Sequence, residues 1–357
     1  MSDPALQLLC AALVLLAPIG IALVLPTGRT SRIAVAAPAG VVGAGALAIT
    51  AALGGGIPDP SARALDAAMA GSIAAVVAML AVPRLGRAGG AVFGAGYGIL
   101  ISPVVFPAVL GEYPTVIATL FGAVDYAGVL ATHIAPAGAL LVVAVLPARV
   151  EVRATDPIRW GRASLGAGMV AIGALGWFVG VERVVDELSA RILGNGALGL
   201  ALAVMAWLVM ERIRWARSTP LSLVSGVMAG WAAIGIGAPF LAPVGLVAVA
   251  LISGLAAGAA RGDNRRNPPG ASAGASLAVI TAVLVGGVMT SLLADGFGLA
   301  ATGTLVLTAA QIGAVLGVVI ASAVLALPCW AVAAIARRLA VPVDARRRAH
   351  PTTTSSG

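Results

Sequence analysis

The sequence of 357 residues has few charged side chains and no lysine at all. Only 10% of the residues are charged, whereas 60% are hydrophobic and the mean hydropathy is +1.04. A soluble domain of this length carries far more charge, so the composition predicts an integral membrane protein. All 22 basic residues are arginines, and the formal net charge is +8. Because these arginines follow a membrane topology, described below, the charge does not predict binding to nucleic acid.

Cysteine and histidine are equally scarce, with two of each. Cys10 and Cys329 fall in the first and last apolar segments, and neither belongs to a cluster with metal-ligand spacing, so no metal site, disulfide or cofactor is predicted. The lack of lysine excludes a phosphate-binding loop, and no Ser/His/Asp or Cys/His set can be assembled. An enzyme is therefore not predicted. Residues 1–4 lack a positive charge cluster, so the first segment is expected to be a retained span rather than a cleaved signal peptide.

Eleven apolar segments are long enough, or nearly so, to cross a bilayer as helices. The predicted spans lie near residues 4–26, 33–53, 67–82, 89–110, 125–146, 165–185, 192–210, 220–238, 243–260, 271–294 and 304–336. The third is short. The last is long, so it is expected to tilt strongly or to begin outside the membrane or as a re-entrant piece. The 46 glycines and many alanines favour close packing of helices in lipid.

The arginines predict the orientation of these spans. Nineteen of the 22 lie in the odd-numbered connections and the C-terminal tail, and only Arg63, Arg183 and Arg191 lie in the even-numbered ones. The positive-inside rule then places the N-terminus outside and the C-terminus in the cytoplasm. The chain is expected to form one transmembrane domain, residues 1–338. A basic, disordered cytoplasmic tail, residues 339–357, is expected to follow it and to contact anionic lipid.

One predicted span carries ionisable groups. Asp125 lies at the start of the fifth segment, and His133 is the only histidine of the hydrophobic body. In a helix the two would be about 12 Å apart along the axis, with His133 near the middle of a core about 30 Å thick. Ionisable groups at that depth are costly and indicate function. The structural alternatives are an N-cap for Asp125 and an interhelical hydrogen bond for His133.

Several motifs resemble the ammonium transporter (Amt/Rh) family. The stretch Asp125-Tyr-Ala-Gly128, followed by His133 and Gly138, resembles the family's fifth span with its pore histidine. Four further stretches are similar to later spans in the same order: Gly176-Trp177-Phe178 to the sixth, Thr219–Gly230 to the eighth, Gly286–Thr290 to the tenth and Gln311 to the eleventh. The resemblance covers roughly residues 60–338.

This resemblance implies an all-α polytopic fold of eleven spans. Two inverted five-helix halves, spans 1–5 and 6–10, would precede a final helix, with the N-terminus out and the C-terminus in. It also implies a homotrimer in the plasma membrane, with one pore in each subunit that carries ammonium or ammonia, or a similar small weak base. In the family two histidines touch across the pore, and a trimeric PII signalling protein is a possible cytoplasmic regulator.

The chain departs from the family at the pore. The second histidine falls at Val279, and the phenylalanine and asparagine expected after Trp177-Phe178 are Gly180 and Val181. The third-span phenylalanine falls near Met69, and the acid expected before the tenth span is missing from residues 268–275. Pro136, just after His133, removes a backbone donor.

Six residues are candidates for the transport pore: Asp125, Thr132, His133, Trp177, Ser225 and Val279. Trp177 has an alternative as an interfacial anchor and Ser225 as a small residue for close helix packing. The predicted function is transport of ammonium or ammonia through an atypical pore with a single histidine. Two alternatives stay open, namely a non-conducting homologue that acts as a sensor or assembly partner and a permease for another small solute.

Overall fold

The computed structural model describes residues 3–25, 29–53, 59–111, 114–147, 158–262 and 273–340. Within these ranges the chain is helical and contains no strand; one isolated bridge pairs Leu241 with Ala294. The predicted all-α polytopic fold is therefore confirmed. The basic tail falls mainly on residues 341–357, outside the described residues.

The first part of the described chain forms the helices α1 (Pro4–Val14), α2 (Leu16–Val24), α3 (Arg29–Leu53), α4 (Pro60–Gly96), the π-helical turn η1 (Tyr97–Ile101), α5 (Ser102–Leu110), α6 (Val116–Phe121), the π-helical turn η2 (Leu130–Ile134) and α7 (Ala135–Val145). The second part forms α8 (Trp160–Glu182), α9 (Glu187–Trp215), α10 (Leu221–Ile234), the 3-10 turn η3 (Ala238–Phe240), α11 (Pro243–Arg261), α12 (Ala273–Leu293), α13 (Leu299–Thr302) and α14 (Val306–Leu339).

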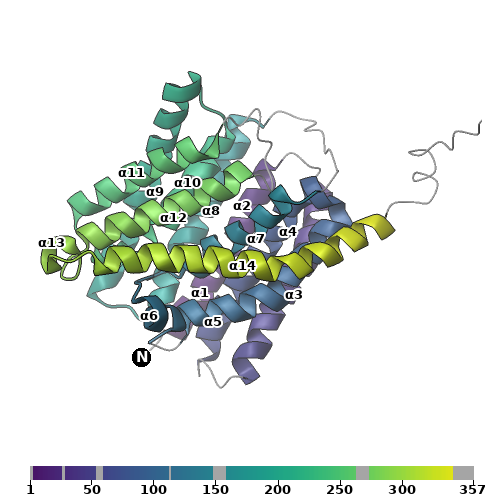
Figure 1. The fold of residues 1–357 in the computed structure, drawn as a ribbon, viewed down its shortest axis with the longest axis horizontal. Coiled ribbons are helices and arrows are strands. Elements are labelled where there is room, and N and C mark those ends of the chain that lie inside the picture. Colours follow the sequence, from purple (N-terminus) through teal and green to yellow (C-terminus); the bar gives the residue numbers. More distant parts are fainter. Residues whose placement is uncertain are drawn as a thin grey trace, which may run out of the picture.

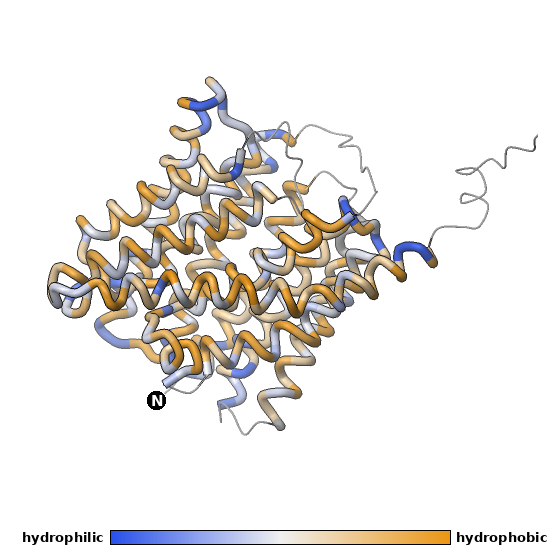
Figure 2. The backbone as a smooth tube through the Cα atoms, viewed as in Figure 1, coloured by the Kyte–Doolittle hydropathy of each residue, from blue (hydrophilic) through white to orange (hydrophobic). Residues whose placement is uncertain are grey.

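Eight helical segments are long and apolar enough to cross a membrane, by length and composition. One of them, Pro60–Leu110, is 51 residues long and is broken at Gly86, whose φ of 71° and ψ of 178° are not helical. By length it therefore suffices for two crossings, one on each side of Gly86. Two shorter apolar helices, Leu130–Val145 and Leu221–Ile234, complete a set of eleven segments among the described residues. This is the number that the apolar runs predict. Hydrophobic residues cover these helices, and hydrophilic ones gather at their ends (Figure 2).

The helices pack into one bundle (Figure 1). α3 packs on α4, α2 on α8, and α11 lies between α9 and α12. Glycine permits backbone contact where α2 crosses α8: a Cβ atom on Gly20 would lie 2.4 Å from the carbonyl oxygen of Gly166. A larger residue at this crossing would force the two helices apart.

The last helix, α14, is a single helix of 34 residues with Pro328 inside it. It is about 51 Å long at 1.5 Å per residue, well beyond the thickness of a hydrocarbon core. It crosses the bundle in front of its neighbours (Figure 1) and packs against α4, α7 and α12. The long last apolar segment, predicted near residues 304–336, therefore forms one continuous helix, and the short helix α13 (Leu299–Thr302) precedes it.

Candidate functional site

The segment before His133 is not helical, which corrects the span predicted for residues 125–146. Residues 122–128 run as a loop, and regular helix begins only at Leu130. The loop pairs with the end of α10, because the amides of Tyr126 and Ala127 donate to the carbonyls of Ile236 and Gly235 at 3.1 and 2.8 Å. These bonds replace the intrahelical ones that the loop gives up. The axial separation of 12 Å between Asp125 and His133, which assumed a helix, therefore does not apply.

Asp125 caps the helix that follows this loop. Its two carboxylate oxygens accept hydrogen bonds from the amides of Val129 and Leu130, at 2.8 Å each. The first amides of a helix have no intrahelical partner, so the carboxylate satisfies them. The side chain also borders a cavity of about 270 Å³ on the side predicted to be outside, the outer cavity, lined among others by Thr115, Tyr126 and Phe240.

Trp177 fixes the same loop from the side of α8. Its side chain is fully buried, and its Nε1–H donates to the carbonyl of Ala127 at 2.7 Å. Its ring meets that of Phe106 edge-on, with centroids 6.2 Å apart. A second hydrogen bond joins the loop to α8, with the donor on the loop: the hydroxyl of Tyr126 donates to the carbonyl of Phe178 at 2.7 Å. Trp177 is buried in the protein and is not among the residues that line the cavity around His133.

A π-helical turn presents His133. In η2 the amide of Ala135 donates to the carbonyl of Leu130, five residues back, so the turn is wider than an α-helical one. Such turns often occur at functional sites. Pro136, which has no amide proton, follows directly and lies at the start of α7, where a missing donor is tolerated. Pro136 and His133 both line one cavity.

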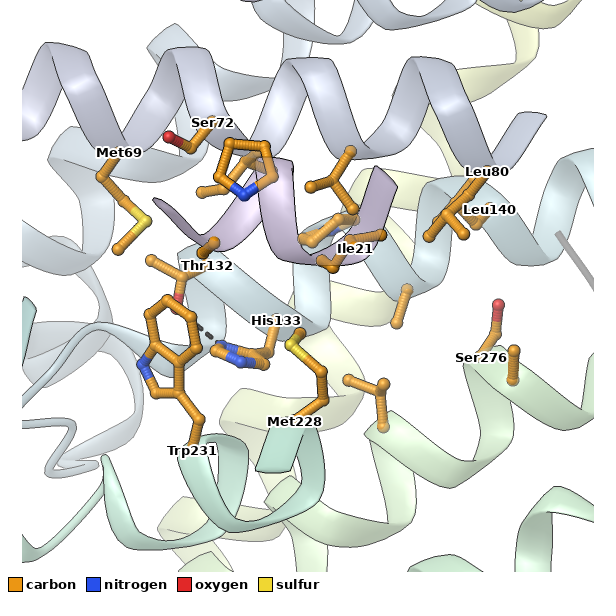
Figure 3. Close-up of a pocket in the computed structure, with 18 residues that line it drawn as sticks. Ile21, Met69, Ser72, Leu80, Thr132, His133, Leu140, Met228, Trp231 and Ser276 are labelled. Carbon is orange, nitrogen blue, oxygen red and sulfur yellow. Dashed lines mark hydrogen bonds between the residues drawn. The ribbon is translucent and has the colours of Figure 1, made fainter. Parts of the chain in front are cut away.

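The cavity around His133 has a volume of about 120 Å³. Its walls come from α2, α4, η2 and α7 in the first half of the chain and from α10 and α12 in the second (Figure 3). The labelled side chains include Met69, Ser72, Met228 and Ser276. Nearly all of the wall is apolar, and it includes Val279, the position where the family resemblance predicts the second histidine.

His133 is 3% exposed, and its two ring nitrogens differ. Nδ1 lies 2.8 Å from the hydroxyl of Thr132, with which it shares a hydrogen bond (Figure 3). The same hydroxyl donates to the carbonyl of Gly128 at 3.1 Å. Nε2 is buried and has no hydrogen-bond partner among the described residues. A buried polar atom left unpaired costs about 1–3 kcal/mol, so this nitrogen is the chemical focus of the cavity.

Trp231 of α10 covers one end of this cavity. Its ring meets the imidazole edge-on, with ring centroids 5.1 Å apart and an angle of 71° between the planes. In Figure 3 it lies with Thr132 and Met69 on one side of His133, whereas Leu80, Leu140 and Ser276 lie on the other. Met69 belongs to the part of α4 predicted to be near the outside. The outer cavity beside Asp125 and the His133 cavity have no lining residue in common.

A second cavity, of about 140 Å³, continues from the first in the direction predicted to be inward. The two share six lining residues: Ile21, Val76, Leu80, Met228, Ala275 and Val279. Ser225 lines the second cavity only, as does Arg261, the last residue of α11.

The six candidate residues therefore separate into groups. Thr132, His133 and Val279 line the same cavity, Ser225 borders its inward continuation, and Asp125 and Trp177 hold the loop that precedes His133. Sequence reasoning missed Trp231 and Arg261. A tryptophan inside the predicted span 220–238, directly after Gly230, was the available signal for the first. Nothing distinguished Arg261 from the other arginines near helix ends. No group of three or more His, Cys, Asp or Glu residues suited to a metal ion occurs among the described residues.

Comparison by sequence finds ammonium transporters. No family model matches the chain. The ammonium transporter of Bacillus subtilis is 31% identical over 134 residues, which make up 37% of this chain and 33% of that protein. Those of Aquifex aeolicus and Mycobacterium tuberculosis are 29% identical over 136 and 153 residues, or 38% and 42% of this chain and 32% of each protein. The matched region thus spans about a third of the length of these relatives.

Comparison by structure covers nearly the whole chain. A solved structure described as a sensor Amt protein superposes with a TM-score of 0.76 at 18% identity, over 99% of this chain and 98% of the other. The Mep2 protein of Saccharomyces cerevisiae gives a TM-score of 0.71 at 19% identity, over 94% and 84%. That of Candida albicans gives 0.70 at 16%, over 94% and 83%. At these identities the likeness concerns the fold.

Proposed function

We propose that the chain is a divergent member of the ammonium transporter family and that it carries ammonia or a similar small weak base through a pore with a single histidine. One observation supports this most directly. The Nε2 atom of His133 is buried in a cavity of about 120 Å³ and has no partner among the described residues. The cavity has room for a small solute, because one water needs about 10–15 Å³ of such a volume.

The hydroxyl of Thr132 sets the tautomer of His133 in this proposal. A hydroxyl has one proton, and that of Thr132 is donated to the carbonyl of Gly128. Its oxygen then accepts from Nδ1–H, so the proton of the neutral imidazole is on Nδ1. Besides the hydroxyls of Ser72 and Ser276, which also line this cavity, Nε2 offers it a free lone pair. It is the atom that accepts a hydrogen bond from an N–H of the passing solute.

The apolar wall favours the neutral form of the solute. Moving an amine-like group out of water without a partner costs roughly 2–7 kcal/mol, and one hydrogen bond to Nε2 offsets part of that cost. An ion pays far more, since the described lining residues of this cavity include no carboxylate. Ammonium therefore gives its proton to water on the outer side, and neutral ammonia crosses. With Val279 rather than a histidine in the wall of the same cavity, His133 has no second imidazole with which to pass that proton along.

The remaining candidate residues have supporting roles. Asp125 and Trp177 act as positioning residues, because they hold the loop and the helix start that present His133. Val279 forms pore wall, and Ser225 offers a hydroxyl on the inward side. Trp231 limits access from the outer side. We also propose assembly as a homotrimer in the plasma membrane. A PII-type regulator on the cytoplasmic side stays a prediction.

The test is ammonia uptake in proteoliposomes, followed by a pH indicator trapped inside. His133→Leu, close in volume and unable to hydrogen-bond, should lower uptake by roughly tenfold, the factor that corresponds to about 1.4 kcal/mol. Thr132→Val is the matched variant. It keeps the imidazole but removes the hydroxyl that holds the proton on Nδ1, so a smaller loss of uptake is expected. If the uptake of His133→Leu equals that of the unmutated protein, His133 has a packing role and transport proceeds without it.

A non-conducting protein that senses or assembles is the second candidate. Two observations favour it: the outer cavity and the His133 cavity share no lining residue, and a structure described as a sensor Amt protein has the same fold over its whole length. Uptake by the unmutated protein equal to that of empty liposomes would end the transport proposal and support this one. A permease for another small neutral solute is distinguished by uptake of that solute, such as glycerol or urea, in the absence of ammonia uptake.

A further inference from the structure

The inward cavity has one ionisable lining residue among those described. Its wall of about fifteen residues is apolar except for Ser225 and Arg261. Arg261 is only 4% exposed, although it ends a helix at the predicted cytoplasmic side, where an arginine would ordinarily extend into water. Because this cavity shares six lining residues with the one around His133, a solute that moves inward from His133 passes Arg261.

The partner of Arg261 lies behind it. Glu211 of α9 is 2% exposed, and its charge acts on Arg261. Its Oε1 accepts from the Nε1–H of Trp207 at 3.2 Å, and its Oε2 accepts from the amide of Thr219 at 3.1 Å and from the hydroxyl of Ser222. These bonds fix the carboxylate among α9, α10 and the turn between them.

The pair is therefore oriented with respect to the cavity. Arg261 lines it, whereas Glu211 is absent from the lining. A fixed dipole with its positive end toward the solute repels cations more than it attracts them, because the Coulomb energy falls with distance and the carboxylate is the farther charge. A neutral solute experiences no such net force. Fixed arginines act in this way as barriers to cations in other membrane pores.

We propose that Arg261 is a specificity-determining residue that excludes cations at the inner end of the pore, so that ammonia passes and ammonium, methylammonium and alkali cations do not. The inference rests on the proposed transport function and adds a reason for electroneutral flux that is independent of the missing second histidine. Glu211 is a positioning residue that holds the guanidinium against the cavity and balances its charge inside the protein.

The experiment compares two readings on the same proteoliposomes. Ammonia uptake is measured with the internal pH indicator, and charge movement is measured as current on a supported membrane after an ammonium pulse. The double variant Glu211→Gln/Arg261→Gln removes both charges and leaves no unpaired buried ion, which a single removal would do. In this double variant the ratio of charge moved to ammonia taken up should rise by roughly tenfold. Ser225→Asp, which leaves the pair intact and adds a negative charge to the same cavity, should change the ratio in the same direction.

Two controls isolate the position of the charge. Arg261→Lys keeps a cation in the cavity. Arg212→Gln removes an exposed arginine next to Glu211, near the end of α9. Both should leave the ratio as in the unmutated protein. The inference is overturned if uptake persists while neither the double variant nor Ser225→Asp raises the ratio, or if the unmutated protein already moves one charge per ammonia. Uptake no higher than that of empty liposomes would instead remove the transport function on which the inference rests.

Discussion

Val279 and His133 belong to different halves of the chain and face the same cavity. A histidine at position 279 would thus bring a second imidazole near the first. Two neighbouring imidazoles can exchange a proton, because each neutral ring has one donor and one acceptor. We expect Val279→His to add a current to the ammonia uptake of the unmutated protein.

That current should increase further when the variant is combined with Glu211→Gln and Arg261→Gln, because the inward charge no longer opposes a cation. Val279→Leu, which fills the cavity without an imidazole, is the control and should add no current. Equal currents in the histidine and leucine variants would contradict a proton path between the rings.

At the level of single residues, the sequence identifies ionisable side chains that are rare in apolar segments. It does not show which side chains line the same cavity. His133 is predictable because an imidazole in the middle of an apolar segment has a high cost and needs a reason. Trp231 was missed because a tryptophan in a helix is usually explained by packing. Arg261 was assigned to topology alone, since only its burial at 4% exposure separates it from the exposed Arg212.

The element that decides the geometry around His133 is the loop of residues 122–128. Gly128 has a φ of +60°, and a Cβ atom there would lie 2.6 Å from the side chain of Leu110. Gly128→Ala should therefore destabilise the protein by about 2 kcal/mol or more, from backbone strain and from this clash. It should also lower ammonia uptake, because the loop presents His133. Thermal unfolding in detergent measures the first effect.

Gly122→Ala is a close control for this variant. Gly122 also has a positive φ, of +73°, but a Cβ atom there would have nothing within 4 Å. It should cost only the backbone strain of about 1–2 kcal/mol and leave uptake nearly unchanged. Equal losses of melting temperature in the two variants would show that the Leu110 contact does not matter.

The elements themselves could largely be predicted, because a bilayer demands long apolar segments whatever their packing. The break in the fifth segment could not. Tyr126 and Ala127 belong to an apolar run that is typical of a helix, and their amides pair instead with the carbonyls of Ile236 and Gly235, about 110 residues later. A hydrogen-bond partner so far away in the chain cannot be predicted from the neighbouring residues. The break at Gly86 falls between two predicted spans and was expected as a connection.

At the scale of the whole molecule, we expect a homotrimer. The expectation comes from the family and from the small-residue helix faces that permit close contact in lipid. Many large apolar side chains are exposed on the single chain, such as Ile49, Leu120 and Val244, at 62%, 70% and 83%. Lipid or neighbouring subunits must cover them. Mass measurement of the complex in mild detergent and in nanodiscs tests the prediction, and a persistent monomer in both would count against it.

The orientation of the molecule follows from its arginines and can be tested on the same chain. Cys10 and Cys329 are both buried and free, so a parent with alanine at both positions provides a silent background. Glu187→Cys, at the exposed start of α9, is predicted to be outside, and Ala349→Cys, in the basic tail, to be inside. In intact cells an impermeant maleimide should therefore label position 187 and spare position 349, and lysis should make both reactive. Because nineteen arginines would have to cross the bilayer to reverse the molecule, mixed labelling is not expected. Labelling of position 349 in intact cells would show that the topology is the reverse of the predicted one. Arg261 would then lie at the outer end of the cavities, where solute enters, rather than at the inner end.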